Sequence, residues 1–155
     1  MGLARRTDTR SRYPDREEVR FDPGLLATRL QTDLPDVQFA YLMGSASDGI
    51  VPRYADLDVA VYFASGIRVG WDRINETMTV VEEVVGGIEV DVGILNDAGP
   101  VFCFEALKGR QLFVRPDAME EFIRFFSMTC RKYEDYMYRV ERYRRYRQEL
   151  KNAAA

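Results

Sequence analysis

The chain has 155 residues, of which 46% are hydrophobic and 30% are charged, and its net charge is −3. This length suits one compact domain rather than two, and no apolar run reaches the length of about 18 residues that a transmembrane helix requires. Histidine is absent, which excludes His-dependent catalytic triads and His-ligated zinc. Acid–base or metal chemistry must therefore rely on carboxylates.

The N-terminal residues 1–22 combine arginines and acidic residues with little apolar content, so we predict a flexible tail there. The arginines are not followed by an apolar stretch, as they would be in a secretory signal. Cys103 and Cys130 lie far apart and share no metal-type spacing. This cysteine usage is typical of a reduced protein, and we predict a cytoplasmic location.

Strand and helix patterns alternate through the middle of the chain. Strong strand patterns cover Val37 to Met43, Leu57 to Phe63 and Ile88 to Leu95, and a weaker edge strand covers Gln111 to Val114. Helical patterns cover Gly24 to Leu34, Trp71 to Val85 and Pro100 to Leu107, with Asp97 as the expected N-cap of the third. This order predicts one α/β domain over residues 23–116, with a small mixed sheet flanked by helices.

A long C-terminal helix is predicted within residues 117–155. Asp117 and Glu120 have the spacing of a capping box at its start. An apolar and aromatic stripe then follows at steps of three and four residues: Phe122, Phe125, Thr129, Tyr133, Tyr136, Val140 and Tyr143. Such a helix is longer than one small domain can cover, so we expect it to pack on the domain and also on a partner chain.

Aspartates recur on one face of two predicted strands. Alternation places Asp56 and Asp58 on one side of their strand and Asp91 on the corresponding side of the next. If the strands are neighbours, these carboxylates converge on one open face, where mutual repulsion favours a bound cation. Oxygen ligands suit Mg²⁺. Alternatively, the aspartates are the solvated face of an ordinary amphipathic strand.

A glycine–serine pair directly follows the first strand. Gly44 and Ser45 stand where a strand-to-helix turn would present backbone N–H groups and a hydroxyl to an anion. A plain tight turn is the simpler interpretation of such a pair. The continuous stretch GSASDGIVPRYADLD, however, sets ten residues between Ser45 and Asp56. Together with Asp91 on an independent strand, this pattern is more specific than any of its parts.

The stretches YLMGSASDGIVPRYADLDVAVYF, EVDVGIL and FEALKGRQLFVRPD resemble minimal nucleotidyltransferases (MNT) of the DNA polymerase beta superfamily, the antitoxins of HEPN/MNT toxin–antitoxin systems. The resemblance spans roughly Val37 to Asp117. It implies a polymerase beta-like nucleotidyltransferase fold and transfer of AMP from ATP to a hydroxyl, expected to be a tyrosine of a cognate HEPN toxin.

The resemblance also assigns roles to individual residues. Gly44 and Ser45 would hold the terminal phosphates of ATP, and Asp56 and Asp58 would bind Mg²⁺. Asp91 would complete this metal-binding and catalytic triad and help to deprotonate the attacking hydroxyl.

Two positions depart from the family pattern. Members often have arginine and serine where this chain has Asp48 and Ala55, which removes one phosphate contact. Arg53 either compensates as a nucleotide-binding residue or is an ordinary exposed arginine. Two alternatives therefore stay open: a small-molecule nucleotidyltransferase of the aminoglycoside type, and a non-catalytic antitoxin that neutralises its toxin by binding.

Tyrosines and arginines interleave along the end of the last helix. Nucleic-acid binding is one interpretation of this composition. A packing stripe with basic residues that complement the helix dipole is the favoured one. The resemblance implies ATP and a HEPN toxin as partners, with a second copy of the chain as the alternative partner of this helix; nucleic acid and a membrane are not expected.

Overall fold

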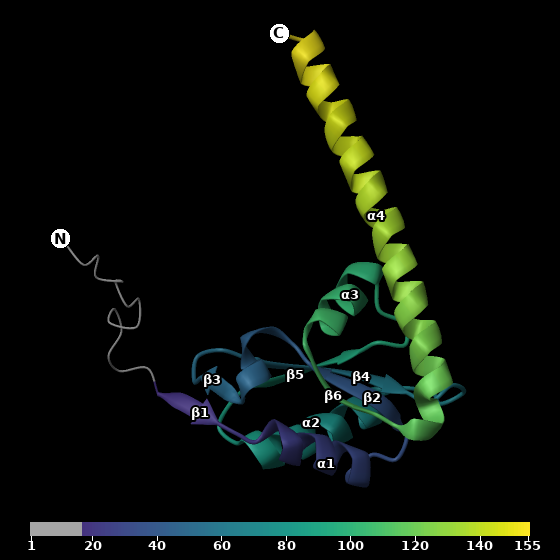
Figure 1. Ribbon diagram of the computed structural model, residues 1–155. Helices are drawn as coiled ribbons and strands as arrows, with labels where there is room; N and C mark the ends of the chain where they lie inside the picture. Colours follow the sequence, from purple (N-terminus) through teal and green to yellow (C-terminus); the bar gives the residue numbers. More distant parts are fainter. Residues whose placement is uncertain (1–16) are drawn as a thin grey trace, which may run out of the picture.

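The computed structural model describes residues 17–155. A four-stranded mixed sheet lies between two layers of helices (Figure 1). Its strands are β2 (Val37–Leu42), β4 (Leu57–Phe63), β5 (Val90–Ile94) and β6 (Arg110–Val114), in the spatial order β5-β4-β2-β6. Strand β2 is antiparallel to β4 and β6, whereas β4 and β5 are parallel. The predicted α/β class and small mixed sheet are confirmed.

Helices cover both faces of this sheet (Figure 1). One layer contains α1 (Pro23–Asp33) and α2 (Trp71–Val85), which pack against each other. The other contains α3 (Pro100–Lys108) and the beginning of α4 (Met119–Ala153). Two short 3-10 turns, η2 (Gly44–Asp48) and η3 (Pro116–Ala118), follow β2 and precede α4.

Alternating side chains of the central strands fill two cores. Val59 and Val61 of β4 join Leu26 of α1 in a first core below the sheet. Ala60, on the opposite face of β4, belongs to a second core with Phe39, whose ring stacks on that of Tyr62 at 4.4 Å between centroids. Because successive residues of a strand point to opposite faces, a sheet covered on both sides needs apolar residues at nearly every position.

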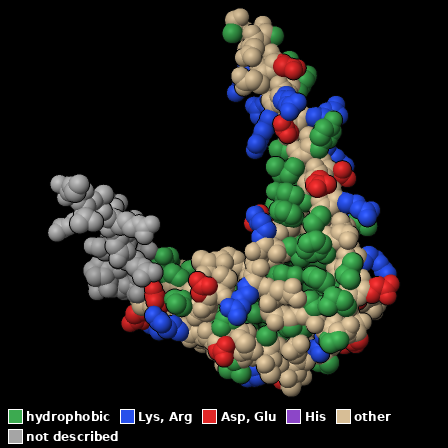
Figure 2. Space-filling model, viewed as in Figure 1, with side chains coloured by type: hydrophobic (Ala, Val, Ile, Leu, Met, Phe, Trp, Pro, Cys, Tyr) green, Lys and Arg blue, Asp and Glu red, His purple; other side chains and the backbone are tan. Residues whose placement is uncertain are grey.

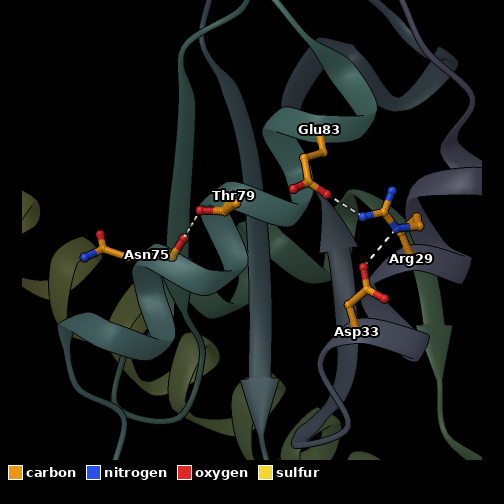
Figure 3. A network of polar contacts seen from close by, with 5 residues as sticks. All are labelled: Arg29, Asp33, Asn75, Thr79 and Glu83. Atoms are coloured by element: carbon orange, nitrogen blue, oxygen red, sulfur yellow. Dashed lines mark hydrogen bonds and ion pairs between the residues drawn. The ribbon is translucent and has the colours of Figure 1, made fainter.

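A polar network joins the surfaces of α1 and α2 (Figure 3). The Arg29 guanidinium donates to Asp33 on its own helix, at 2.9 Å, and to Glu83 on α2. Within α2, the Thr79 hydroxyl donates to the backbone carbonyl of Asn75 at 2.9 Å. These groups are exposed, so they contribute little to stability beside the core beneath them.

The prediction of a flexible tail over residues 1–22 is wrong for residues 17–22, which the structure describes. Residues 1–16 of the predicted tail lie outside the described residues. Strand β1 (Glu18–Arg20) pairs antiparallel with β3 (Ile50–Pro52) in a separate two-stranded sheet. Three-residue strands carry too little periodicity to be predicted from sequence, and only the pairing of distant segments stabilises them. This ribbon borders the loop that leads to the candidate active site.

Helix α4 has 35 residues, about 50 Å at 1.5 Å per residue, and its second half stands away from the domain (Figure 1). Phe122 and Phe125 pack on the second core, and Tyr133 stacks on Phe104 with 3.8 Å between ring centroids. Beyond that stack, Tyr136, Tyr143 and most other side chains are exposed. No helix within residues 17–155 is both long and apolar enough to cross a membrane.

Both predicted helix caps are wrong. Helix α4 begins after Ala118, which makes no side-chain cap bond, because Asp117 is taken up in η3. Helix α3 begins after Gly99 rather than Asp97. In α3, Pro100 occupies the first helical turn, where its fixed φ and missing N–H suit a helix start.

Candidate active site

Two of the predicted aspartates lie directly beside each other on neighbouring strands. Asp58 of β4 and Asp91 of β5 are paired residues of the parallel register, so their side chains leave the sheet on the same face. Both are exposed, and Asp56 is exposed immediately before β4. The two strands are neighbours, which is the condition on which the convergence of the aspartates depended, and their pairing brings the three carboxylates to one end of the sheet.

These carboxylates interact through their charges. The pKa of Asp58 is raised, first by desolvation and then by the negative charges of Asp91 and Asp56. Burial and like charge both disfavour the ionised form. A cation bound beside Asp58 would offset this repulsion.

The glycine–serine turn adjoins Asp58. The backbone N–H of Met43 donates to the Asp58 carbonyl at 2.9 Å, which ties the end of β2 to the start of β4. Directly after this bond, Gly44 has a φ of +67°, in the left-handed region that favours glycine, and opens η2. Gly44 and Ser45 are both exposed. The predicted anion-binding turn and the aspartates therefore share one end of the sheet.

The aspartate-bearing face is open only at that end. We expected the whole face to be open, but Ala60 and Leu95 on the same face are buried in the second core beneath α3 and α4. The approach of α3 is close at Gly93, where an added Cβ would lie 2.2 Å from the Phe102 ring. The carboxylates are therefore an exposed polar edge on a sheet that is otherwise covered on both sides.

Arg53, the arginine expected to bind the nucleotide, makes an ion pair with an acidic side chain. The Arg53 guanidinium pairs with Glu17, beside the ribbon of β1 and β3. Instead, Arg110 at the start of β6 donates to the carbonyl of Ser47 in η2 at 2.9 Å. Sequence reasoning missed Arg110, because only the pairing of Leu42 with Arg110 brings β6 to this turn. The sequence feature that could have indicated Arg110 is its position directly after Gly109, within the stretch FEALKGRQLFVRPD that resembles the family.

The donor set suits a hard divalent cation. Across residues 17–155, no three His, Cys, Asp or Glu side chains are gathered into a ready-made metal cluster. Asp56, Asp58 and Asp91 nevertheless supply exposed carboxylate oxygens that repel one another, and such oxygens are the ligands of Mg²⁺, which also retains water and phosphate oxygens.

The family model for Polymerase beta, Nucleotidyltransferase, matches residues 26–118. This range covers more than half of the chain, so the chain belongs to this nucleotidyltransferase family. The match includes the glycine–serine turn and all three aspartates, whereas α4 lies beyond its end. No curated protein matches the chain.

Solved structures share the fold. A toxin–antitoxin structure with AMP-PNP is 22% identical with a TM-score of 0.57, covering 77% of this chain and 96% of that chain. A mutant of the MntA–HpeT toxin–antitoxin is 20% identical with a TM-score of 0.57 and the same coverage. A structure from Shewanella oneidensis is 18% identical with a TM-score of 0.53, over 77% of this chain and 92% of that chain. The predicted polymerase beta-like fold is thereby confirmed.

Proposed function

We propose that this chain is a Mg²⁺-dependent nucleotidyltransferase that acts as an antitoxin, transferring AMP from ATP to a tyrosine hydroxyl of a HEPN-domain toxin. The observation that carries the proposal is the meeting of Asp56, Asp58 and Asp91 with the Gly44–Ser45 turn at one end of the sheet. Family membership supports nucleotidyl transfer. A protein of the same fold has been solved in a toxin–antitoxin structure with AMP-PNP.

The three aspartates would hold the metal. Bound there, Mg²⁺ would neutralise phosphate charge and favour departure of pyrophosphate. In the MntA–HpeT mutant, two aspartates two positions apart are changed to glutamate. Asp56 and Asp58 have the same spacing.

The turn would hold the triphosphate. The exposed backbone of Gly44 and the Ser45 hydroxyl suit phosphate oxygens. We propose Arg110 as an additional cation at this turn, because it already contacts the Ser47 carbonyl. Arg53 stays a predicted contact that would first have to leave Glu17.

The proposed transfer is a substitution at phosphorus, in which no group is oxidised or reduced. The tyrosine oxygen attacks the α-phosphorus of ATP, a new O–P bond forms, and the bond from the α-phosphorus to the bridging oxygen of the β-phosphate breaks. Pyrophosphate leaves with that bonding pair. The hydroxyl proton passes to the Asp91 carboxylate, which is exposed next to Asp58.

We further propose that the chain is divided by role. Residues 23–116 form the transferase domain, and residues 117–155 form the helix that packs on it and docks the toxin. Hydrophobic side chains line the protruding helix, with basic ones toward its end (Figure 2). Five arginines and one glutamate lie between residues 139 and 147. Such a cluster of like charge favours an acidic surface of the toxin as its partner.

Neutralisation by binding alone is the second candidate function. Asp48 favours it, because this exposed carboxylate lies within the η2 turn that would meet the triphosphate.

Thermal unfolding with Mg²⁺ and ATP tests the proposed site. Binding should stabilise the folded chain by about 2.7 kcal/mol when ATP exceeds its Kd about a hundredfold. Asp56→Ala combined with Asp58→Ala should abolish this shift without unfolding the protein, because both side chains are exposed. Asp117→Ala with Glu120→Ala is the matched control. A shift that persists in the first double variant would remove these aspartates from the site.

A further inference from the structure

A groove of about 500 Å³ adjoins the candidate active site between β5 and α2. Four consecutive residues, 89–92, line it from the β5 side. Because successive side chains of a strand point to opposite faces, consecutive residues line one groove only along the free edge of the strand. Strand β5 is an outer strand of the sheet, and no other strand within residues 17–155 pairs with that edge. The backbone groups along this edge of β5 are therefore not paired with any strand of residues 17–155.

The opposite wall is one face of α2. Trp71, Ile74 and Met78 line the groove at helical steps of three and four residues. Trp71 is 78% exposed, and Ile74 and Met78 are half-buried and belong to neither core. A free strand edge facing an apolar helix wall accepts an extended peptide, which adds to the sheet and places alternate side chains on the helix.

The rim of the groove is acidic and continuous with the candidate active site. Asp56, Glu89 and Asp91 contribute carboxylates, and no basic side chain of residues 17–155 lines it. Two of these three belong to the proposed metal site. A peptide along β5 would therefore bring a side chain to Asp91, and its flanking residues would be favoured if basic.

We infer that this groove binds the acceptor as an extended, basic, tyrosine-bearing segment of the partner protein, added to the free edge of β5. The inference rests on the proposed function, because it names the acceptor site of the same reaction. The tyrosine ring would pack on the apolar wall of α2 and its hydroxyl would reach Asp91. A small phenol would leave both the strand edge and most of that wall without a contact.

Trp71 supplies a direct reporter, because it is the single tryptophan of the chain. The probe is a short synthetic peptide with a central tyrosine, a valine on either side and lysines at both ends. Under tryptophan-selective excitation, this peptide should shift the Trp71 emission to shorter wavelength and protect it from acrylamide in a saturable way. The same peptide with glutamates at its ends, or with N-methyl groups that prevent strand pairing, should bind at least about tenfold more weakly.

A matched pair of substitutions localises the binding. Met78→Arg puts a cation into the groove and should weaken the lysine peptide at least about tenfold, whereas Leu25→Arg, at a half-exposed leucine of α1, should not. Met78→Arg should also raise the KM for the protein acceptor and leave the thermal shift with Mg²⁺ and ATP unchanged, because the groove variant spares the Gly44–Ser45 turn.

Several outcomes overturn the inference. Equal protection of Trp71 by tyramine and by the peptide would indicate a small acceptor, and equal binding of the N-methylated peptide would exclude strand addition. Absence of any effect up to millimolar peptide would remove the groove as a peptide site. Normal AMP transfer by Met78→Arg would show that the groove is not the acceptor site, while the proposed transferase activity would stand. Peptide binding by a chain that transfers no AMP would instead support the groove as a peptide site and contradict the proposed transferase activity.

Discussion

At the scale of single residues, the candidate site depends on charges that the fold holds in an unfavourable position. Asp58 is held beside Asp91 by the parallel register of two strands that are packed on both faces. The register fixes the backbone of Asp58 beside that of Asp91, and the pKa of Asp58 is raised, first by desolvation and then by the charges of Asp91 and Asp56. Sites arranged for function commonly retain such strain.

Asp58→Asn should therefore stabilise the metal-free protein. A folded-state pKa above the unfolded-state value means that the charged form is disfavoured in the fold. This penalty is fully present above the folded-state pKa and vanishes below the unfolded-state pKa. Thermal unfolding in chelator should show a higher Tm for Asp58→Asn at neutral pH, with the gain lost as the solution is acidified. A destabilised variant at neutral pH would contradict this electrostatic account.

Gly93 gives a second prediction at this scale. A Cβ there would lie 2.2 Å from Phe102 Cζ, so α3 approaches the sheet only because this position has no side chain. Gly93→Ala should cost about 1–3 kcal/mol of unfolding free energy, the usual cost of overpacking. Chemical denaturation measures it, and Gly99→Ala, where nothing lies within 4 Å of the added Cβ, is the control. An unchanged midpoint for Gly93→Ala would show that α3 adjusts freely.

At the scale of elements, sequence patterns predicted the segments whose hydrophobic period is long and regular. The predicted strand Leu57 to Phe63 and helix Trp71 to Val85 have the bounds observed. The β1–β3 ribbon was missed, because three-residue strands are defined by pairing between distant segments. The same limit explains Arg53 and Arg110: side-chain contacts with Glu17 and Ser47 depend on strand pairing that no local pattern reports.

Helix α4 has two parts with different expected roles. Residues up to Tyr133 are fixed by the second core and by the stack on Phe104, whereas the following side chains are exposed. Truncation after Asp135 should therefore change the free energy of unfolding by less than about 1 kcal/mol, since it removes almost no buried surface. The same truncation should weaken toxin binding at least about tenfold. Denaturation and a binding titration measure both effects.

The opposite pattern would revise this division of α4. A large loss of stability with unchanged toxin binding would mean that the distal half supports the fold and that the docking surface lies elsewhere. Truncation after Leu150 serves as the matched control, because it keeps the stripe of Tyr136, Val140 and Tyr143.

At the scale of the whole molecule, the structure combines a covered sheet, an acidic edge and a protruding basic helix. Sequence patterns predicted two of these features, because strand alternation located the aspartates and the helical stripe located α4, but not the cover that α3 and α4 form over the rest of the aspartate-bearing face. They did not predict the groove along β5, which exists only because the sheet ends at β5 and α2 folds back beside it. The proposed docking and the proposed transfer are compatible, since a bound toxin would have to place its hydroxyl close to the α-phosphate before reaction.

Asp91→Asn tests whether the molecule acts by chemistry. The substitution keeps the shape of an exposed side chain and removes the proton acceptor. Transfer of AMP should fall at least about a hundredfold, while toxin binding through α4 should be unchanged. Near-normal transfer would mean that the third carboxylate has another role.

The central claim is tested most directly by mass spectrometry of a HEPN toxin incubated with a small molar fraction of this protein, Mg²⁺ and ATP. A catalyst should inactivate a molar excess of toxin and leave each toxin molecule heavier by one or more AMP groups on tyrosine. Omission of ATP should abolish both effects. Unmodified toxin, protected only at equal stoichiometry and without regard to nucleotide, would contradict the transferase and leave neutralisation by binding.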